Sequence, residues 1–167
     1  MIVENNVILT TLEIKHKLRR IAYQIYESNV DENEIILAGI ADNGYKLAKE
    51  LKTVLGKISG KNIVLCEVKI DKKNPLAEIQ TSLDPSDYKN KSVVLVDDVL
   101  NSGTTLIHGV KHFLNVPLKQ FKTAVLVNRN HKKYPVKADF KGISLSTAIQ
   151  EHITVNLEGK SVQAILE

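Results

Sequence analysis

Residues 93–105 read Val93-Val94-Leu95-Val96-Asp97-Asp98-Val99-Leu100-Asn101-Ser102-Gly103-Thr104-Thr105, and they carry the clearest structural signal in the sequence. The four apolar residues 93–96 are typical of a strand buried in a parallel sheet. Two carboxylates end that strand, and a short turn then enters a helix expected over residues 104–114. Because ligands of open α/β sheets bind outside the carboxyl ends of the strands, this turn predicts a ligand site.

The turn after the two acids has the chemistry of a phosphate site. Backbone N–H groups at a helix N-terminus lack partners within the helix and attract anions. Ser102, Thr104 and Thr105 add hydroxyl donors, and Gly103 allows the backbone to approach a ligand closely. The adjacent aspartates would repel one another unless sugar hydroxyls, or a Mg²⁺ shared with the substrate's phosphates, compensated their charge.

Asp97 and Asp98 also have a purely structural interpretation, in which they are turn residues and Asn101 or Ser102 only caps the next helix. The whole pattern favours a ligand site, because paired acids and a Gly/Thr turn directly follow one buried strand. The sequence has neither a Walker-type phosphate loop nor a G-x-G-x-x-G motif, so nucleoside triphosphate and dinucleotide folds lose support.

Strands and helices are expected to alternate on both sides of this stretch. Thr10 and Glu13 predict a capping box for a helix that reaches about residue 28, and a second helix follows Asp42-Asn43-Gly44. The other strands are expected at residues 35–40, 63–70, 122–127 and 152–157, the last as an edge strand. Residues 71–90 and 128–137 are expected to be loops. This order predicts one α/β domain over residues 1–167, with a mainly parallel central sheet flanked by helices.

The composition excludes several classes of protein. The 167 residues are 43% hydrophobic and 25% charged, which is too apolar and too mixed in charge for disorder. No apolar run approaches the roughly 20 residues of a membrane span, and residues 1–6 lack the pattern of a secretory signal. The single cysteine cannot form an intramolecular disulfide or build a zinc site alone. We therefore expect a cytoplasmic protein with no membrane partner.

Positive charge is concentrated in the C-terminal third of the chain. Residues 106–150 hold eight of the 23 basic residues and one of the 19 acidic residues, within a net charge of +4. The skew indicates an anionic partner, either a phosphorylated small molecule or a nucleic acid, although a solvated lysine surface explains it equally well.

Residues 93–105 resemble the phosphoribosyl pyrophosphate (PRPP) signature of type I phosphoribosyltransferases. The resemblance implies that family's α/β fold with a small hood, and transfer of a 5-phosphoribosyl group from PRPP to a nucleobase with release of pyrophosphate. It also implies that Asp97 and Asp98 hold the ribose, and that Mg²⁺ arrives with PRPP rather than being fixed by the protein alone. The implied 5′-phosphate loop consists of Asn101, Ser102, Gly103, Thr104 and Thr105.

Further segments are similar to one branch of that family, the pyrimidine operon attenuation regulators that double as uracil phosphoribosyltransferases. Residues 37–44 match the pyrophosphate loop of that branch, and residues 138–143 resemble its hood, where the base is expected to sit. The implied pyrophosphate-binding residues are Ala41, Asp42, Asn43 and Gly44, and the implied base-binding residues are Arg129, Phe140 and Ile143. The resemblance favours uracil as the base, a role in pyrimidine salvage, and a homodimer or larger homo-oligomer.

Several positions depart from the pattern of that branch. An arginine is expected before Gly44 but Asn43 is present, and Thr104 stands where an arginine is common. Asn101 replaces a tyrosine, and also the aspartate that purine-using relatives carry near the base. Since a neutral amide cannot act as a general base, this disfavours a purine enzyme of that mechanism. Residues 71–90 form a shorter loop without an Arg-Asp-Asp signature, which predicts an effect on catalytic rate more than on PRPP binding.

Two functions remain open from the sequence. The chain is either an enzyme or a regulator that binds messenger RNA through residues 15–20 and 128–137 and senses nucleotides with little or no catalysis. Arg129 either faces the base or a substrate phosphate, or pairs with Asp139. Phe140 either stacks on the base or belongs to the core.

Overall fold

The computed structural model describes residues 6–167, which form two sheets and four helices. The larger sheet consists of β2 (Glu34–Ile40), β3 (Asn62–Lys69), β4 (Gln80–Thr81), β5 (Ser92–Leu100), β6 (Gln120–Arg129) and β7 (Phe140–Leu145). The smaller sheet consists of β1 (Asn6–Leu9), β8 (Ile153–Asn156) and β9 (Gln163–Leu166). The helices are α1 (Thr11–Ser28), α2 (Asn43–Ile58), α3 (Pro85–Tyr88) and α4 (Thr104–Phe113). Residues 1–5, in the segment where no secretory signal is expected, lie outside the described residues.

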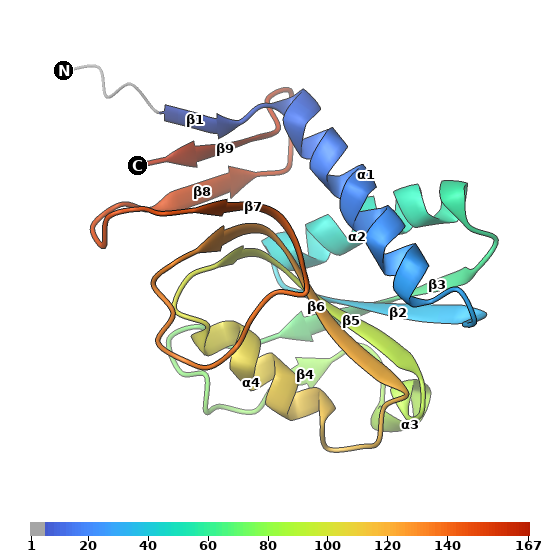
Figure 1. The fold of residues 1–167 in the computed structure, drawn as a ribbon. Helices are drawn as coiled ribbons and strands as arrows, with labels where there is room; N and C mark the ends of the chain where they lie inside the picture. The colour runs from blue at the N-terminus through green and yellow to red at the C-terminus, as the bar shows by residue number, and fades with distance from the viewer. Residues whose placement is uncertain (1–5) are drawn as a thin grey trace.

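The larger sheet is almost entirely parallel, as the sequence predicts. Its strand order is β4-β3-β2-β5-β6-β7, and only the two-residue β4 runs antiparallel to its neighbour. Helices α1 and α2 cover one face of this sheet and α4 covers the other (Figure 1). The carboxyl ends of the parallel strands therefore meet at one edge, where a doubly covered sheet binds its ligands.

The helix signals in the sequence correspond to real contacts. The Thr10 hydroxyl accepts from the backbone N–H of Glu13 at 3.3 Å, and the Glu13 carboxylate accepts from the N–H of Thr10 at 2.8 Å, so the predicted capping box is confirmed. Apolar side chains of α1 at helical spacing, among them Ile14, Leu18 and Ile21, are buried against the sheet. None of the helices in residues 6–167 has the length and hydropathy that crossing a bilayer would require.

Two predicted boundaries need correction. Strand β5 does not end before the acids but continues to Leu100, because β6 still pairs with it there, as in the pairs Asp97 with Val125 and Val99 with Val127. Residues 71–90 are not loop throughout, since they contain β4 and α3. Tyr88 of α3 is buried beside the Phe113 ring, with ring centroids 4.9 Å apart.

The hood is built from a different part of the chain than the sequence suggested. Residues 138–143, expected in the hood, mostly belong to β7, which pairs in parallel with β6 at the edge of the larger sheet. The small antiparallel sheet β1-β9-β8 stands instead beside the carboxyl ends of the large sheet (Figure 1). Strand β8 lies at the edge of that small sheet, as its alternating sequence predicts.

Candidate active site

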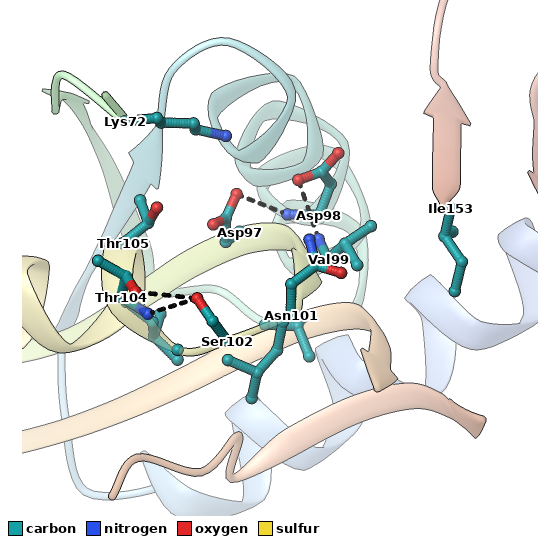
Figure 2. Close-up of a pocket in the computed structure, with 13 residues that line it drawn as sticks. Lys72, Asp97, Asp98, Val99, Asn101, Ser102, Thr104, Thr105 and Ile153 are labelled. Atoms are coloured by element: carbon teal, nitrogen blue, oxygen red, sulfur yellow. Dashed lines mark hydrogen bonds between the residues drawn. The ribbon is translucent and has the colours of Figure 1, made fainter. Parts of the chain in front are cut away.

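The paired acids lie where the large sheet opens. The ladder between β2 and β5 ends at the pair Gly39 with Val96, whereas β6 follows β5 as far as Leu100. Asp97 and Asp98 are therefore the first residues of β5 that lie beyond β2. A cavity of about 290 Å³ occupies this place (Figure 2).

The cavity gathers every residue predicted to hold the ribose and the 5′-phosphate. Its lining includes Asp97, Asp98, Asn101, Ser102, Gly103, Thr104 and Thr105. The lining residues that the sequence did not indicate include Lys72, from the loop after β3, and Ile153, from β8. Lys72 extends over the cavity toward Asp97, and Ile153 stands on the hood side (Figure 2). Lys72 lies in a polar segment without periodicity, so no sequence signal singled it out.

The two carboxylates have different surroundings. Asp97 is only 4% exposed, and its Oδ1 accepts from the backbone N–H of Asp98 at 2.9 Å. Asp98 is half-buried, and its Oδ1 accepts from the N–H of Val99 at 2.9 Å. Burial raises the pKa of Asp97 well above its usual range, and the neighbouring Asp98 raises it further, while Lys72 partly opposes the shift. A cationic or hydroxyl-rich ligand would relieve this unfavourable charge.

The loop after β5 leaves donors free for an anion. Gly103 has φ +85°, and a Cβ there would lie 2.6 Å from Cγ1 of Val136, so only glycine fits without rearrangement. The hydroxyls of Ser102 and Thr104 lie 2.9 Å apart, and the N–H of Thr104 donates to the Ser102 hydroxyl at 3.3 Å, while Gly103 at the N-cap provides no side-chain cap. The N–H groups of α4 that follow Thr104 are thus available where the helix dipole favours negative charge.

A second loop supports the phosphate loop from behind. The carbonyl of Ser102 accepts from the backbone N–H of Lys133 at 2.7 Å and from that of Tyr134 at 3.2 Å. Lys132 and Lys133 are exposed on this second loop, which belongs to the basic segment at residues 128–137. The loop at residues 101–105 and the basic loop are therefore joined through backbone hydrogen bonds.

The structure separates the residues predicted to bind pyrophosphate. Ala41 and Asp42 line a neighbouring cavity of about 540 Å³ whose other charged residues are Glu67, Lys69, Asp71 and Glu78. Asn43 turns its amide to Asp98 and to β8, and Gly44 packs against β5. The first cavity thus gains no lining residue from this loop among the residues that the structure describes.

Arg129 lies at the end of β6 and is only 6% exposed. Its guanidinium donates to Asn101 Oδ1 at 3.0 Å, to the Thr147 hydroxyl at 2.8 Å, and to two carbonyls of the crossover into the hood. The alternative pairing with Asp139 is wrong, because that carboxylate accepts from the N–H of Thr123 at 2.9 Å. Arg129 therefore joins the phosphate loop to the hood rather than lining the cavity.

Phe140 and Ile143 do not reach the cavity among its described lining residues. Both lie on β7 and pack against the core on the α1 side of the sheet, which agrees with the core interpretation of Phe140. The apolar side chain that the hood does bring to the cavity is Ile153. The sequence could not reveal this exchange, because it depends on how the last strands fold back over the large sheet.

The acids suit a metal that shares its ligands with a substrate. Within residues 6–167, no three His, Cys, Asp or Glu side chains gather as a metal-binding group. Asp97 and Asp98 offer carboxylate oxygens at the cavity, and Mg²⁺ is commonly held by one or two carboxylates together with substrate phosphates and water. The donor set therefore fits Mg²⁺ bound together with a phosphorylated ligand.

This combination of a parallel sheet, paired acids and a phosphate loop agrees with the comparison to known families. Residues 5–159 match the Phosphoribosyl transferase domain family, and the chain belongs to that family. The chain is similar to the Bifunctional protein PyrR of Streptococcus mutans, with 33% identity over 153 residues that cover 90% of this chain and 87% of that protein. The Bifunctional protein PyrR of Bacillus cereus is also 33% identical, over 93% of this chain and 92% of its own.

Solved structures support the same fold. A hypoxanthine phosphoribosyltransferase of Trypanosoma cruzi superposes with a TM-score of 0.79 at 14% identity, covering 96% of this chain and 95% of that one. A hypoxanthine-guanine phosphoribosyltransferase of Bacillus anthracis gives a TM-score of 0.78 at 16% identity, covering 97% and 96% of the two chains. The type I phosphoribosyltransferase fold predicted from residues 93–105 is thereby confirmed.

Proposed function

We propose that this protein transfers a 5-phosphoribosyl group from PRPP to a nucleobase, with uracil as the favoured base, and releases pyrophosphate. The observation that carries the proposal is one cavity that holds Asp97 and Asp98 on one side and the N-terminus of α4 on another. Acids suit ribose hydroxyls, and free N–H groups suit a 5′-phosphate. The expected homo-oligomer and the cytoplasmic location remain predictions.

The proposed reaction exchanges one bond for another at the anomeric carbon of ribose. A base nitrogen forms a bond to that carbon and loses its proton, while the bond to the pyrophosphate oxygen breaks and its electron pair leaves with pyrophosphate. Asp97 and Asp98 would hold the ribose hydroxyls while positive charge grows on the ring, so their contribution is orientation and electrostatic stabilisation. When bound, Mg²⁺ would neutralise charge on the pyrophosphate.

Lys72 and Ile153 extend the proposed site beyond the residues that the sequence suggested. The ammonium group of Lys72, on the loop after β3, lies over the cavity and would attract a phosphorylated substrate. Ile153 offers an apolar wall on the hood side, and a flat nucleobase can pack against such a wall. We therefore propose that the base lies near β8 rather than against Phe140 or Ile143.

The test is pyrophosphate release from PRPP and Mg²⁺, with uracil, hypoxanthine, guanine and xanthine supplied separately. Release with uracil alone is the expected result. A response to a purine would keep the transferase and overturn the proposed base. No release with any base, together with intact PRPP binding, would favour the second candidate function.

That second candidate is a regulator that binds RNA and senses a nucleotide in the same cavity. It is favoured by the hydrogen bonds from Lys133 and Tyr134 to Ser102, which join the basic loop to the phosphate loop. The exposed Lys132, Lys133 and Lys137, and the α1 cluster at residues 15–20, would supply contacts to phosphates. Arg20 is less available than its sequence suggested, because it donates to the carbonyls of Lys141 and Gly142.

The regulator is tested by binding of a structured leader RNA from a pyrimidine operon. Affinity should fall steeply as salt rises, and it should change when a uridine nucleotide is added. Lys132→Gln/Lys133→Gln should weaken binding, whereas Lys52→Gln/Lys89→Gln, at exposed positions outside both basic segments, is a control that removes the same charge. Binding that ignores salt, or that is equal in both variants, would contradict this second function.

A further inference from the structure

Asn43 connects three parts of the site through one side chain. Its amide nitrogen donates to Asp98 Oδ2 at 3.0 Å and to the carbonyl of Val155 at 2.9 Å. The amide lies at the start of α2, the carboxylate on β5 and the carbonyl on β8 of the hood. Both partners are acceptors, so the nitrogen and not the oxygen of the amide must face them.

Close packing of the backbone holds Asn43 in this place. A Cβ on Gly44 would lie 2.6 Å from the carbonyl oxygen of Val96 and 3.0 Å from Cα of Asp97, so the start of α2 is pressed against β5. A Cβ on Gly39 would lie 2.4 Å from Cα of Tyr45, which brings β2 equally close to the same turn. These approaches leave the Asn43 amide little freedom to turn elsewhere.

A second contact joins the same helix to the hood. The Lys46 ammonium lies 3.1 Å from Glu158, on the turn after β8. That pair is largely exposed and contributes little by itself. The half-buried amide of Asn43 is the stronger link, because a hydrogen bond to a charged acceptor is about twice as strong as one between neutral groups.

We propose that Asn43 is a positioning residue that orients Asp98 for the ribose and couples that carboxylate to the hood; this rests on the proposed function of the cavity. With Oδ1 held by the N–H of Val99 and Oδ2 held by Asn43, the carboxylate plane of Asp98 is fixed. Each oxygen keeps a further lone pair for a ribose hydroxyl. Asn43 thereby serves Asp98 instead of binding pyrophosphate itself.

The charged groups around this contact determine how it should respond to an added charge. Asp97 adjoins Asp98 on β5, Asp42 adjoins Asn43 in the chain, and Lys72 reaches over the cavity from the loop after β3. On the hood side, the pair Lys46 and Glu158 lies between α2 and the turn after β8. In Asn43→Asp, a third acid would join the two on β5 and repel Asp98, whereas Asn43→Ala removes the donor without adding charge.

The experiment compares Asn43→Asp with Asn43→Ala, using Mg²⁺ and PRPP as the probe in titration calorimetry. Near pH 8 we expect Asn43→Asp to bind about tenfold or more weakly than the wild type, and Asn43→Ala to lose less. In an Asp98→Asn background, Asn43→Ala should cause little further loss, because the carboxylate that the amide orients is already absent.

Asn62→Asp is the matched control, because Asn62 also donates an amide hydrogen bond to a carboxylate, Glu34, at 2.9 Å. Glu34 and Asn62 lie at the amino ends of β2 and β3, away from the cavity at the carboxyl ends. Asn62→Asp should therefore bind PRPP as the wild type does. Asn43 variants that bind within about twofold of the wild type near pH 8 would overturn the proposal. A loss from Asn43→Ala that is equally large in the Asp98→Asn background would also overturn it, because it would indicate only a general structural role.

Thermal unfolding keeps the two proposals distinguishable. If the wild type did not bind PRPP, the proposed function would be wrong. The contribution of the contact between Asn43 and Asp98 could still be measured from the Tm of the variants. Asn43→Asp should lose more Tm than Asn43→Ala, because it adds repulsion between carboxylates to the loss of the hydrogen bond. Equal losses of Tm in the two variants would contradict the contact.

Discussion

The loops that follow β2 and β5 occupy equivalent places in the sheet but use their polar groups in opposite ways. The loop after β5 presents hydroxyls and the N-terminus of α4 to a cavity. The loop after β2 turns its amide at Asn43 inward and packs Gly44 against the neighbouring strand. The same topology therefore produces one loop built to receive a ligand and one that supports it.

The largest expected effect is on PRPP binding and comes from the two acids before the loop after β5. Asp97→Asn/Asp98→Asn should weaken PRPP binding about 100-fold or more, because charged acceptors for the ribose and the metal are both lost. Glu27→Gln/Asp31→Asn, at two exposed acids near the end of α1 and in the turn before β2, controls for the change in net charge. Calorimetric titration measures both, and normal PRPP binding by the double variant would show that the site is placed incorrectly.

Two glycine substitutions would test the division of roles directly. Gly103→Ala should weaken PRPP binding about tenfold, because an alanine at φ +85° distorts the phosphate loop. Gly44→Ala should mainly lower stability, by about 1–3 kcal/mol, because its Cβ would meet backbone rather than a side chain. Urea unfolding and PRPP titration separate the two effects. Equal losses of binding at equal stability would remove the contrast between the loops.

Lys72 should contribute a smaller, screened effect. Lys72→Gln should weaken PRPP binding about threefold at low salt, because an exposed ammonium attracts phosphates mainly through solvent. The difference from the wild type should fade as salt rises. Lys73→Gln changes the same charge one residue along, outside the described lining of the cavity, and should bind PRPP as the wild type does.

The smallest effect concerns stability and follows from the raised pKa of Asp97. A carboxyl whose pKa is higher in the folded state lowers stability as pH rises from its unfolded pKa, near about 4, through the folded value. Asp97→Asn should therefore raise the free energy of unfolding near neutral pH, and the gain should vanish below about pH 4. If thermal unfolding showed the same gain in stability at every pH, the raised pKa of Asp97 would be contradicted.

The sequence predicted those parts of the molecule whose signals are local. Residues 93–105 held both the buried strand and the chemistry that follows it, and Thr10 with Glu13 described a helix start within four residues. The residues predicted to hold the ribose and the 5′-phosphate line one cavity because they are nearly consecutive in the chain and cannot lie far apart. Local order was therefore sufficient for this half of the site.

The other half depends on contacts between distant segments. Strand β1 pairs with β9 across almost the whole chain, and neither has a periodicity long enough to distinguish it. Arg129 finds its partners only once the crossover at residues 147–151 lies over β6. Asn43 resembled a ligand-binding residue by position, but its partners lie on β5 and β8. Such pairings are set by tertiary packing and not by neighbours in sequence.

Cys66 can report on how often the core of this protein opens. It is the only cysteine of the chain, it is fully buried in β3, and burial raises the pKa of its thiol. A thiol reagent can reach it only when the sheet opens, so the labelling rate counts opening events without any added dye. A variant that loses ligand binding but keeps slow labelling has a damaged site on an intact sheet, whereas rapid labelling identifies a damaged fold.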